Sequence, residues 1–94
     1  MENIKNAKYT VPILHRNGSS RDVLEAQLRK VSEKLREAKK AIDEAWPNGR
    51  DYYVSPVPNA MRKAEAEWAS RRDRVAEVLT EVETLRADML AEWD

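Results

Sequence analysis

All glycines and prolines of this chain lie in two short segments, residues 12–18 and 47–58. These two residue types interrupt helices more strongly than any others. The intervals between them, residues 19–46 and 59–94, are therefore free to form long continuous helices. Because the whole chain has 94 residues, it forms one domain at most.

The first interval has the apolar pattern of a coiled-coil helix. Its seam residues follow a 4-3-4-3-4-3 spacing and are Leu24, Leu28, Val31, Leu35, Ala38, Ile42 and Ala45. Glu, Lys and Arg occupy the other faces, which is typical of a heptad repeat. Ser19 or Ser20 supplies the N-cap, and Pro47 disfavours a helical conformation at Trp46. We expect a helix over residues 20–46.

The second interval predicts a longer helix, over residues 59–93, after a loop of residues 47–58. Either Asn59 caps this helix, or Ser55 caps it with Pro56 at the first helical position. Its apolar residues are Met61, Ala64, Trp68, Val75, Val78, Leu79, Val82, Leu85, Met89, Leu90 and Trp93. Beyond residue 75 they form two adjoining stripes, of which one can face the first helix and the other needs a different partner.

Together these patterns predict an all-α fold: a hairpin of two long antiparallel amphipathic helices within residues 19–94, preceded by an extended basic arm, residues 1–18. Apolar and polar residues alternate around Val11 in the arm, and Pro12 restricts any strand there to an edge. The second stripe favours assembly into a homo-oligomer, a dimer or larger. The alternative is a simple coiled-coil spacer.

Composition excludes several classes of function. Without Cys and with His15 as its only His, the chain has neither a Cys-based zinc site nor a base placed beside a nucleophile. We therefore expect no enzyme, no metal site and no cofactor. The 17 basic and 17 acidic residues balance, which argues against long nucleic acid as a partner. No apolar run is long enough for a membrane span or a signal peptide, so we expect a cytoplasmic protein.

Two motifs are candidates for ligand binding. In the turn motif, residues 15–22, a Gly turn opens a Ser-capped helix, and free backbone N–H groups there suit a phosphate or carboxylate. Its candidate ligand-binding residues are Asn17, Ser19, Ser20 and Arg21. The alternative is an ordinary capped helix start, which the nearby acidic Asp22 favours.

The loop motif, residues 47–53, lies in a connection longer than a helical hairpin needs. Its candidate ligand-binding residues are Asn48, Arg50, Asp51, Tyr52 and Tyr53. Tyrosine rings can stack on a base, and arginine can bind a phosphate or carboxylate. The alternative is that one of the tyrosines folds back to cap the end of the hairpin.

The first helix, about 25 residues long, separates the two motifs by roughly 37 Å. They cannot form one site within one hairpin. They can meet if two chains pack antiparallel, with the loop motif of one beside the turn motif of the other.

The paired motifs, His15-x-Asn-Gly-Ser-Ser-Arg21 and Pro47-Asn-Gly-Arg-Asp-Tyr-Tyr53, joined by a Leu-rich helix, resemble a group of small proteins of tailed phages and prophages. The resemblance runs from about residue 13 to the end of the second helix. Departures from it are the bulky Trp46 before the loop and the segment Pro56-Val-Pro58. The resemblance implies a phage origin and the host cytoplasm, but no settled activity.

Phages also encode small, oligomeric, non-enzymatic proteins that sequester nucleotide signals of host immunity, and this chain is similar to them in size and expected self-association. Our leading hypothesis is a protein that captures a small phosphorylated ligand, such as a nucleotide immune signal, between its subunits. The alternative is a helical adaptor or structural accessory that binds a host or phage protein.

Overall fold

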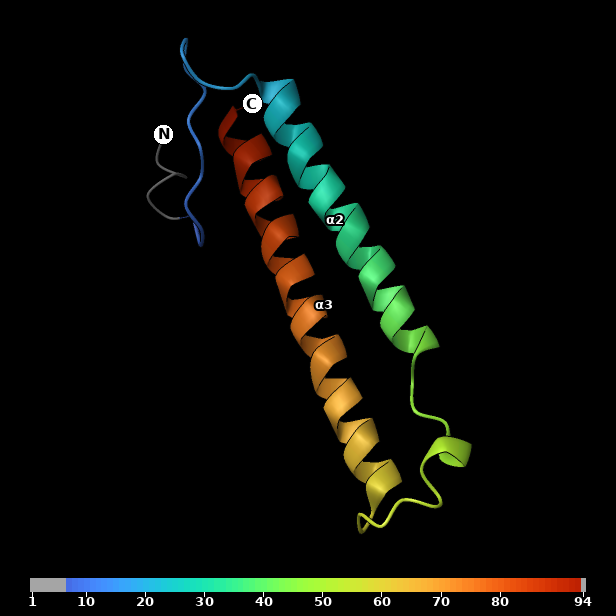
Figure 1. Ribbon diagram of the computed structural model, residues 1–94. Coiled ribbons are helices and arrows are strands. Elements are labelled where there is room, and N and C mark those ends of the chain that lie inside the picture. Colours follow the sequence, from blue (N-terminus) through green and yellow to red (C-terminus); the bar gives the residue numbers. More distant parts are fainter. Residues whose placement is uncertain (1–6, 94) are drawn as a thin grey trace.

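The computed structural model describes residues 7–93 as a helical hairpin with an N-terminal arm (Figure 1). Helix α2 spans Arg21–Glu44, a short 3-10 helix η1 spans Gly49–Asp51, and helix α3 spans Ala60–Trp93. The two long helices run in opposite directions and form a rod with extents of 62 × 23 × 18 Å. The described residues contain no strand. The prediction of an elongated all-α fold with two long helices is confirmed.

Both ends of α2 have local causes in the sequence. The hydroxyl of Ser20 accepts a hydrogen bond from the Val23 N–H at 3.3 Å, which satisfies one of the free donors of the first turn. At the other end the Ala45 N–H bonds to the Ala41 carbonyl at 3.0 Å, and Pro47 follows two residues later. The helix therefore stops just before the residue that proline restricts.

The structure distinguishes between Asn59 and Ser55, the two candidate N-cap residues of α3. Asn59 immediately precedes the helix with φ of 57°, a left-handed conformation that asparagine tolerates better than most residues. Its carbonyl accepts from the Lys63 N–H at 3.0 Å. The Ser55 hydroxyl instead accepts from the Val57 N–H at 3.1 Å, so it shapes the loop. Asn59, not Ser55, is the residue at the helix boundary.

The face of α2 that meets α3 is rotated from the predicted seam. Val31, a seam residue in the heptad pattern, is 43% exposed, whereas its neighbour Ser32 is 1% exposed. Ser32 is small, and small side chains at an interface let two helices approach closely. Val31 therefore lies at the exposed edge of the stripe, because a heptad pattern does not say which edge of the stripe the partner helix covers.

Within residues 7–93, three ion pairs join α2 to α3 in an order that matches their antiparallel alignment. Arg86 pairs with Glu25, Arg36 with Glu83, and Arg72 with Asp43. As the residue number rises along α2 it falls along α3, which is the order that an antiparallel hairpin requires.

The arm packs on α3 within the same chain. It lies beside the last turns of α3, on the side away from α2 (Figure 1). The indole N–H of Trp93 donates to the carbonyl of Pro12 at 3.3 Å, and the adjacent Val11 is buried. The arm thus supplies an intrachain partner for the C-terminal end of the second apolar stripe. The part of the predicted arm before residue 7, and Asp94, lie outside the described residues.

Candidate functional site

The turn motif forms a compact, exposed start to α2. The Gly18 N–H bonds to the His15 carbonyl at 3.2 Å, and a Cβ added at Gly18 would lie 2.7 Å from the His15 Nε2 atom. The imidazole of His15 therefore lies directly against Gly18, and a side chain at position 18 would require this exposed ring to move. Asn17 and Ser19 are exposed, while the Ser20 hydroxyl is already engaged as the cap of α2.

The loop motif folds around η1. The side-chain oxygen of Asn48 accepts from the Arg50 backbone N–H at 2.9 Å, so the amide of Asn48 holds the turn. Arg50 and Asp51 are exposed, and no described hydrogen bond or ion pair involves either of their side chains. Tyr53 is 81% exposed, whereas Tyr52 is half-buried. The expected alternative, a tyrosine folded onto the hairpin end, fits Tyr52 and not Tyr53.

The structure keeps the two motifs apart. They lie at opposite ends of the rod (Figure 1), with the 24 residues of α2 between them, a separation of roughly 36 Å along the helix. Any site that uses both motifs requires a second copy of the chain.

A hollow of about 240 Å³ lies where the loop meets the first turns of α3. We call it the loop hollow; its lining residues are Tyr52, Ser55, Val57, Ala60, Lys63, Ala64 and Glu67. Of these, the sequence motifs pointed only to Tyr52. The signal that could have identified Lys63 and Glu67 is their position, one turn apart at the start of a helix that follows the loop motif.

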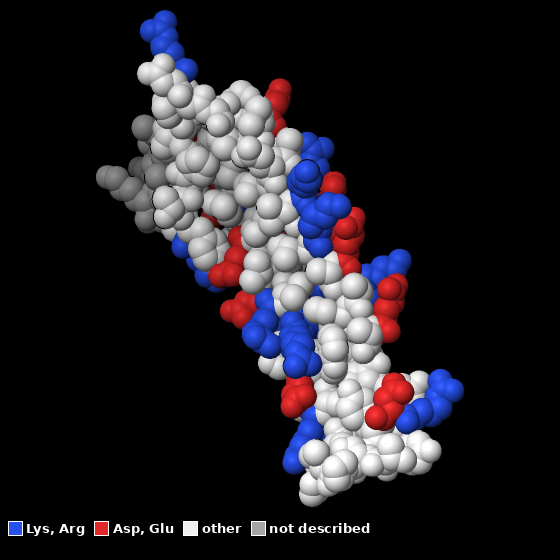
Figure 2. Space-filling model, viewed as in Figure 1, with Lys and Arg blue, Asp and Glu red and all other residues white. Residues whose placement is uncertain are grey.

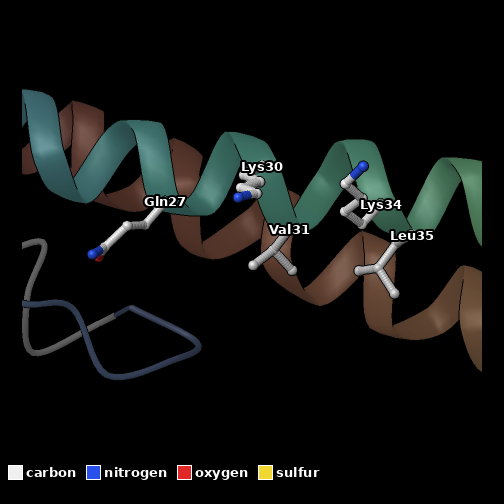
Figure 3. Close-up of a pocket in the computed structure, with 5 residues that line it drawn as sticks. All are labelled: Gln27, Lys30, Val31, Lys34 and Leu35. Atoms are coloured by element: carbon white, nitrogen blue, oxygen red, sulfur yellow. The ribbon is translucent and has the colours of Figure 1, made fainter.

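A second surface feature is an open apolar groove on the face of the hairpin. Two adjoining hollows of about 520 and 310 Å³ share Leu35 and form this groove. Its apolar residues are Val31 and Leu35 of α2 and Val75 and Val78 of α3. Figure 3 shows that Val31 and Leu35 point to the same side of α2, with Lys30 and Lys34 beside them.

Charged residues are mixed along the rod, so the visible face has no extended region of one sign (Figure 2). The basic run at residues 71–74 is partly engaged within the chain. The Arg71 guanidinium lies 4.9 Å from the Trp68 ring centroid, and that of Arg72 lies 4.8 Å from the ring of Trp46. These cation–π contacts hold the two cations against the hairpin.

The ion pair of Glu25 and Arg86 between the two helices changes the protonation equilibrium of the glutamate. The hydrogen bond from Arg86 lowers the pKa of Glu25 below its usual value near 4.5, and the charges of Arg86, Arg29 and Arg21 act in the same direction. Partial burial opposes this shift but does not reverse it.

Among residues 7–93 no three His, Asp or Glu side chains gather as metal ligands would. Neither long helix has a stretch sufficiently apolar to pass through a bilayer. No protein-family model, no curated protein and no solved structure matches the chain. The resemblance of its two motifs to phage proteins therefore stays a prediction.

Proposed function

We propose that this chain is a self-associating, non-enzymatic binding protein that captures a small phosphorylated ligand, such as a nucleotide, at sites between its subunits. The observation that carries the proposal is the exposure of candidate ligand-binding side chains at the loop end of the rod. There Arg50 and Tyr53 are exposed in the loop motif, and the intervening Tyr52 lines a hollow. The second predicted set of ligand contacts lies at the far end of the rod.

Self-association is supported by how little of the chain is buried. A compact monomer of 10.9 kDa exposes about 5,600 Å², whereas this chain exposes 7178 Å². Among the described residues the buried hydrophobic side chains are Val11, Ala64 and Met89. The excess surface and the apolar groove are what a second copy of the chain would cover.

The roles of the candidate residues differ in this proposal. Arg50 binds a phosphate or carboxylate and Tyr53 stacks on a base, since both side chains are open to solvent. Asn17, Ser19 and Arg21 contribute from the turn motif of a second copy. Ser20 and Asn48 act indirectly, because their side chains already hold the backbone of the two motifs.

The resemblance to phage proteins extends the proposal to a biological role. In that role the ligand is a nucleotide signal of host immunity, the site of action is the host cytoplasm, and the protein acts by sequestration. Capture requires binding groups and no catalytic ones. This agrees with the expectation from the sequence that no base lies beside a nucleophile.

A helical adaptor is the second candidate, favoured by the chemistry of the apolar groove. Lys30, Lys34, Arg71 and Arg74 border its apolar floor. An amphipathic helix with acidic flanks has the complementary pattern for such a groove.

Calorimetric titration with cyclic nucleotides and ADP-ribose nucleotides, combined with light scattering, tests the proposal. We expect a particle larger than the 10.9 kDa monomer and a measurable heat for at least one nucleotide. A monomer in solution, or no heat at protein concentrations of tens of micromolar, would favour the adaptor instead.

A further inference from the structure

The loop hollow combines three kinds of surface within a small space. Its floor is made of small residues, Ala60 and the buried Ala64. Tyr52 contributes an aromatic side chain from the loop, and Lys63 and Glu67 contribute opposite charges from α3. A planar ring with polar substituents is complementary to this lining, because its face can stack on the tyrosine and the polar groups on its edge can bind the charged side chains.

The two charges are available to a ligand. Lys63 and Glu67 lie four residues apart on α3, but with the lysine first, which is the weaker order for an ion pair on a helix. No described ion pair or side-chain hydrogen bond joins either of them to another residue. A ligand that carries both an anionic group and N–H donors would satisfy both side chains.

The size of the hollow limits what it can hold. Whole small-molecule sites are roughly 300–1,000 Å³, whereas the loop hollow is about 240 Å³. It accommodates one base but not a complete nucleotide. The sugar and phosphate of the ligand would therefore lie outside the hollow and contact other groups, such as Arg50 or a second copy of the chain.

We propose that the loop hollow is a base-binding subsite for a guanine-type base. The base lies against Tyr52, its adjacent ring and amino N–H groups donate to the carboxylate of Glu67, and the ammonium of Lys63 binds a phosphate of the same ligand. A carboxylate accepts well from base N–H groups, and two such donors side by side match its two oxygens. This inference rests on the proposed function and specifies its ligand class.

The test is an NMR titration of the ¹⁵N-labelled full chain with guanosine 5′-monophosphate, adenosine 5′-monophosphate and inorganic phosphate. Guanosine monophosphate should shift the amide signals of Tyr52, Lys63 and Ala64, and should bind about tenfold more tightly than the adenosine nucleotide. Glu67→Gln should remove this preference, and Lys63→Ala should weaken both nucleotides alike. Lys40→Ala, an exposed lysine of α2 outside the hollow, is the matched control and should change neither affinity.

Equal affinities for the two nucleotides in the unmodified chain, or an unchanged preference in Glu67→Gln, would overturn the inference. The proposed function would survive that result if Arg50→Ala still abolished nucleotide binding. If neither nucleotide shifted any amide signal at millimolar concentration, both the subsite and the proposed function would be wrong.

Discussion

The guanidinium of Arg86 donates to the carboxylate of Glu25 at 3.0 Å, although the two residues are 61 positions apart in the chain. Both side chains are partly buried between α2 and α3. The pair connects the first turns of α2 to the last third of α3, in keeping with the antiparallel alignment of the two helices.

This pair predicts a specific dependence of stability on pH. Because the pKa of Glu25 is lowered in the folded chain, its contribution is complete above the usual pKa near 4.5 and is lost as pH falls through the lowered value. Urea unfolding between about pH 6 and pH 3 should show this loss in the unmodified chain. Glu25→Gln should be less stable near neutral pH and should show a smaller loss on acidification.

Glu37→Gln is the control for this measurement, since Glu37 pairs with Lys34 on an exposed face of α2. Such a pair contributes little to stability. An acid-induced loss that is the same in Glu25→Gln and in the unmodified chain would contradict the assignment of this effect to Glu25.

The contact of the arm with α3 predicts a local effect for Trp93→Phe. Phenylalanine keeps an apolar ring but cannot donate to the Pro12 carbonyl, so the arm should be held more weakly. Amide exchange in residues 8–14 should become faster, while exchange within α2 should stay unchanged. If exchange in the arm is unaffected, the burial of Val11 alone holds it in place.

The main features of the fold could be predicted because they depend on local rules. The positions of proline and glycine marked the interruptions, and the spacing of apolar residues marked the helices. The rotation of α2 toward Ser32 could not be predicted, since it depends on which side chains of α3 come opposite. The contact between Trp93 and Pro12 joins residues 81 positions apart, and no local pattern indicated it.

The candidate site was less accessible from the sequence than the fold. Residue type suggested Arg50 and Tyr53, and both are exposed as a ligand contact must be. Residue type could not show that the Asn48 amide is used to cap η1. Nor could it show that Lys63 and Glu67 join Tyr52 around a hollow, because that depends on the path of the loop back to α3.

The apolar groove predicts which substitution separates self-association from folding. Val78 lines the groove and is 43% exposed in one chain. Val78→Asp should therefore leave the helical signal in circular dichroism nearly unchanged, yet place a carboxylate in the proposed interface, where burial without a partner costs several kcal/mol. Light scattering should report a smaller particle for this variant.

Val23→Asp is the matched control for Val78→Asp, because Val23 is similarly exposed on α2 but does not line the groove. It should leave the particle size unchanged. Equal effects of the two substitutions would mean that the groove is not the interface.

The substitution Arg50→Ala distinguishes most directly between a loop that binds a ligand and a loop that only caps the end of the hairpin. The Arg50 side chain is exposed, and the contact that shapes η1 uses its backbone N–H, which alanine retains. The free energy of unfolding of the variant should lie within about 0.5 kcal/mol of that of the unmodified chain. The variant should nevertheless lose nucleotide binding in calorimetry. Arg62→Ala, an exposed arginine at the start of α3 outside the loop hollow, should preserve both properties. If Arg50→Ala instead destabilised the chain by several kcal/mol, the arginine would be part of the cap of the hairpin, and the ligand site would have to lie elsewhere.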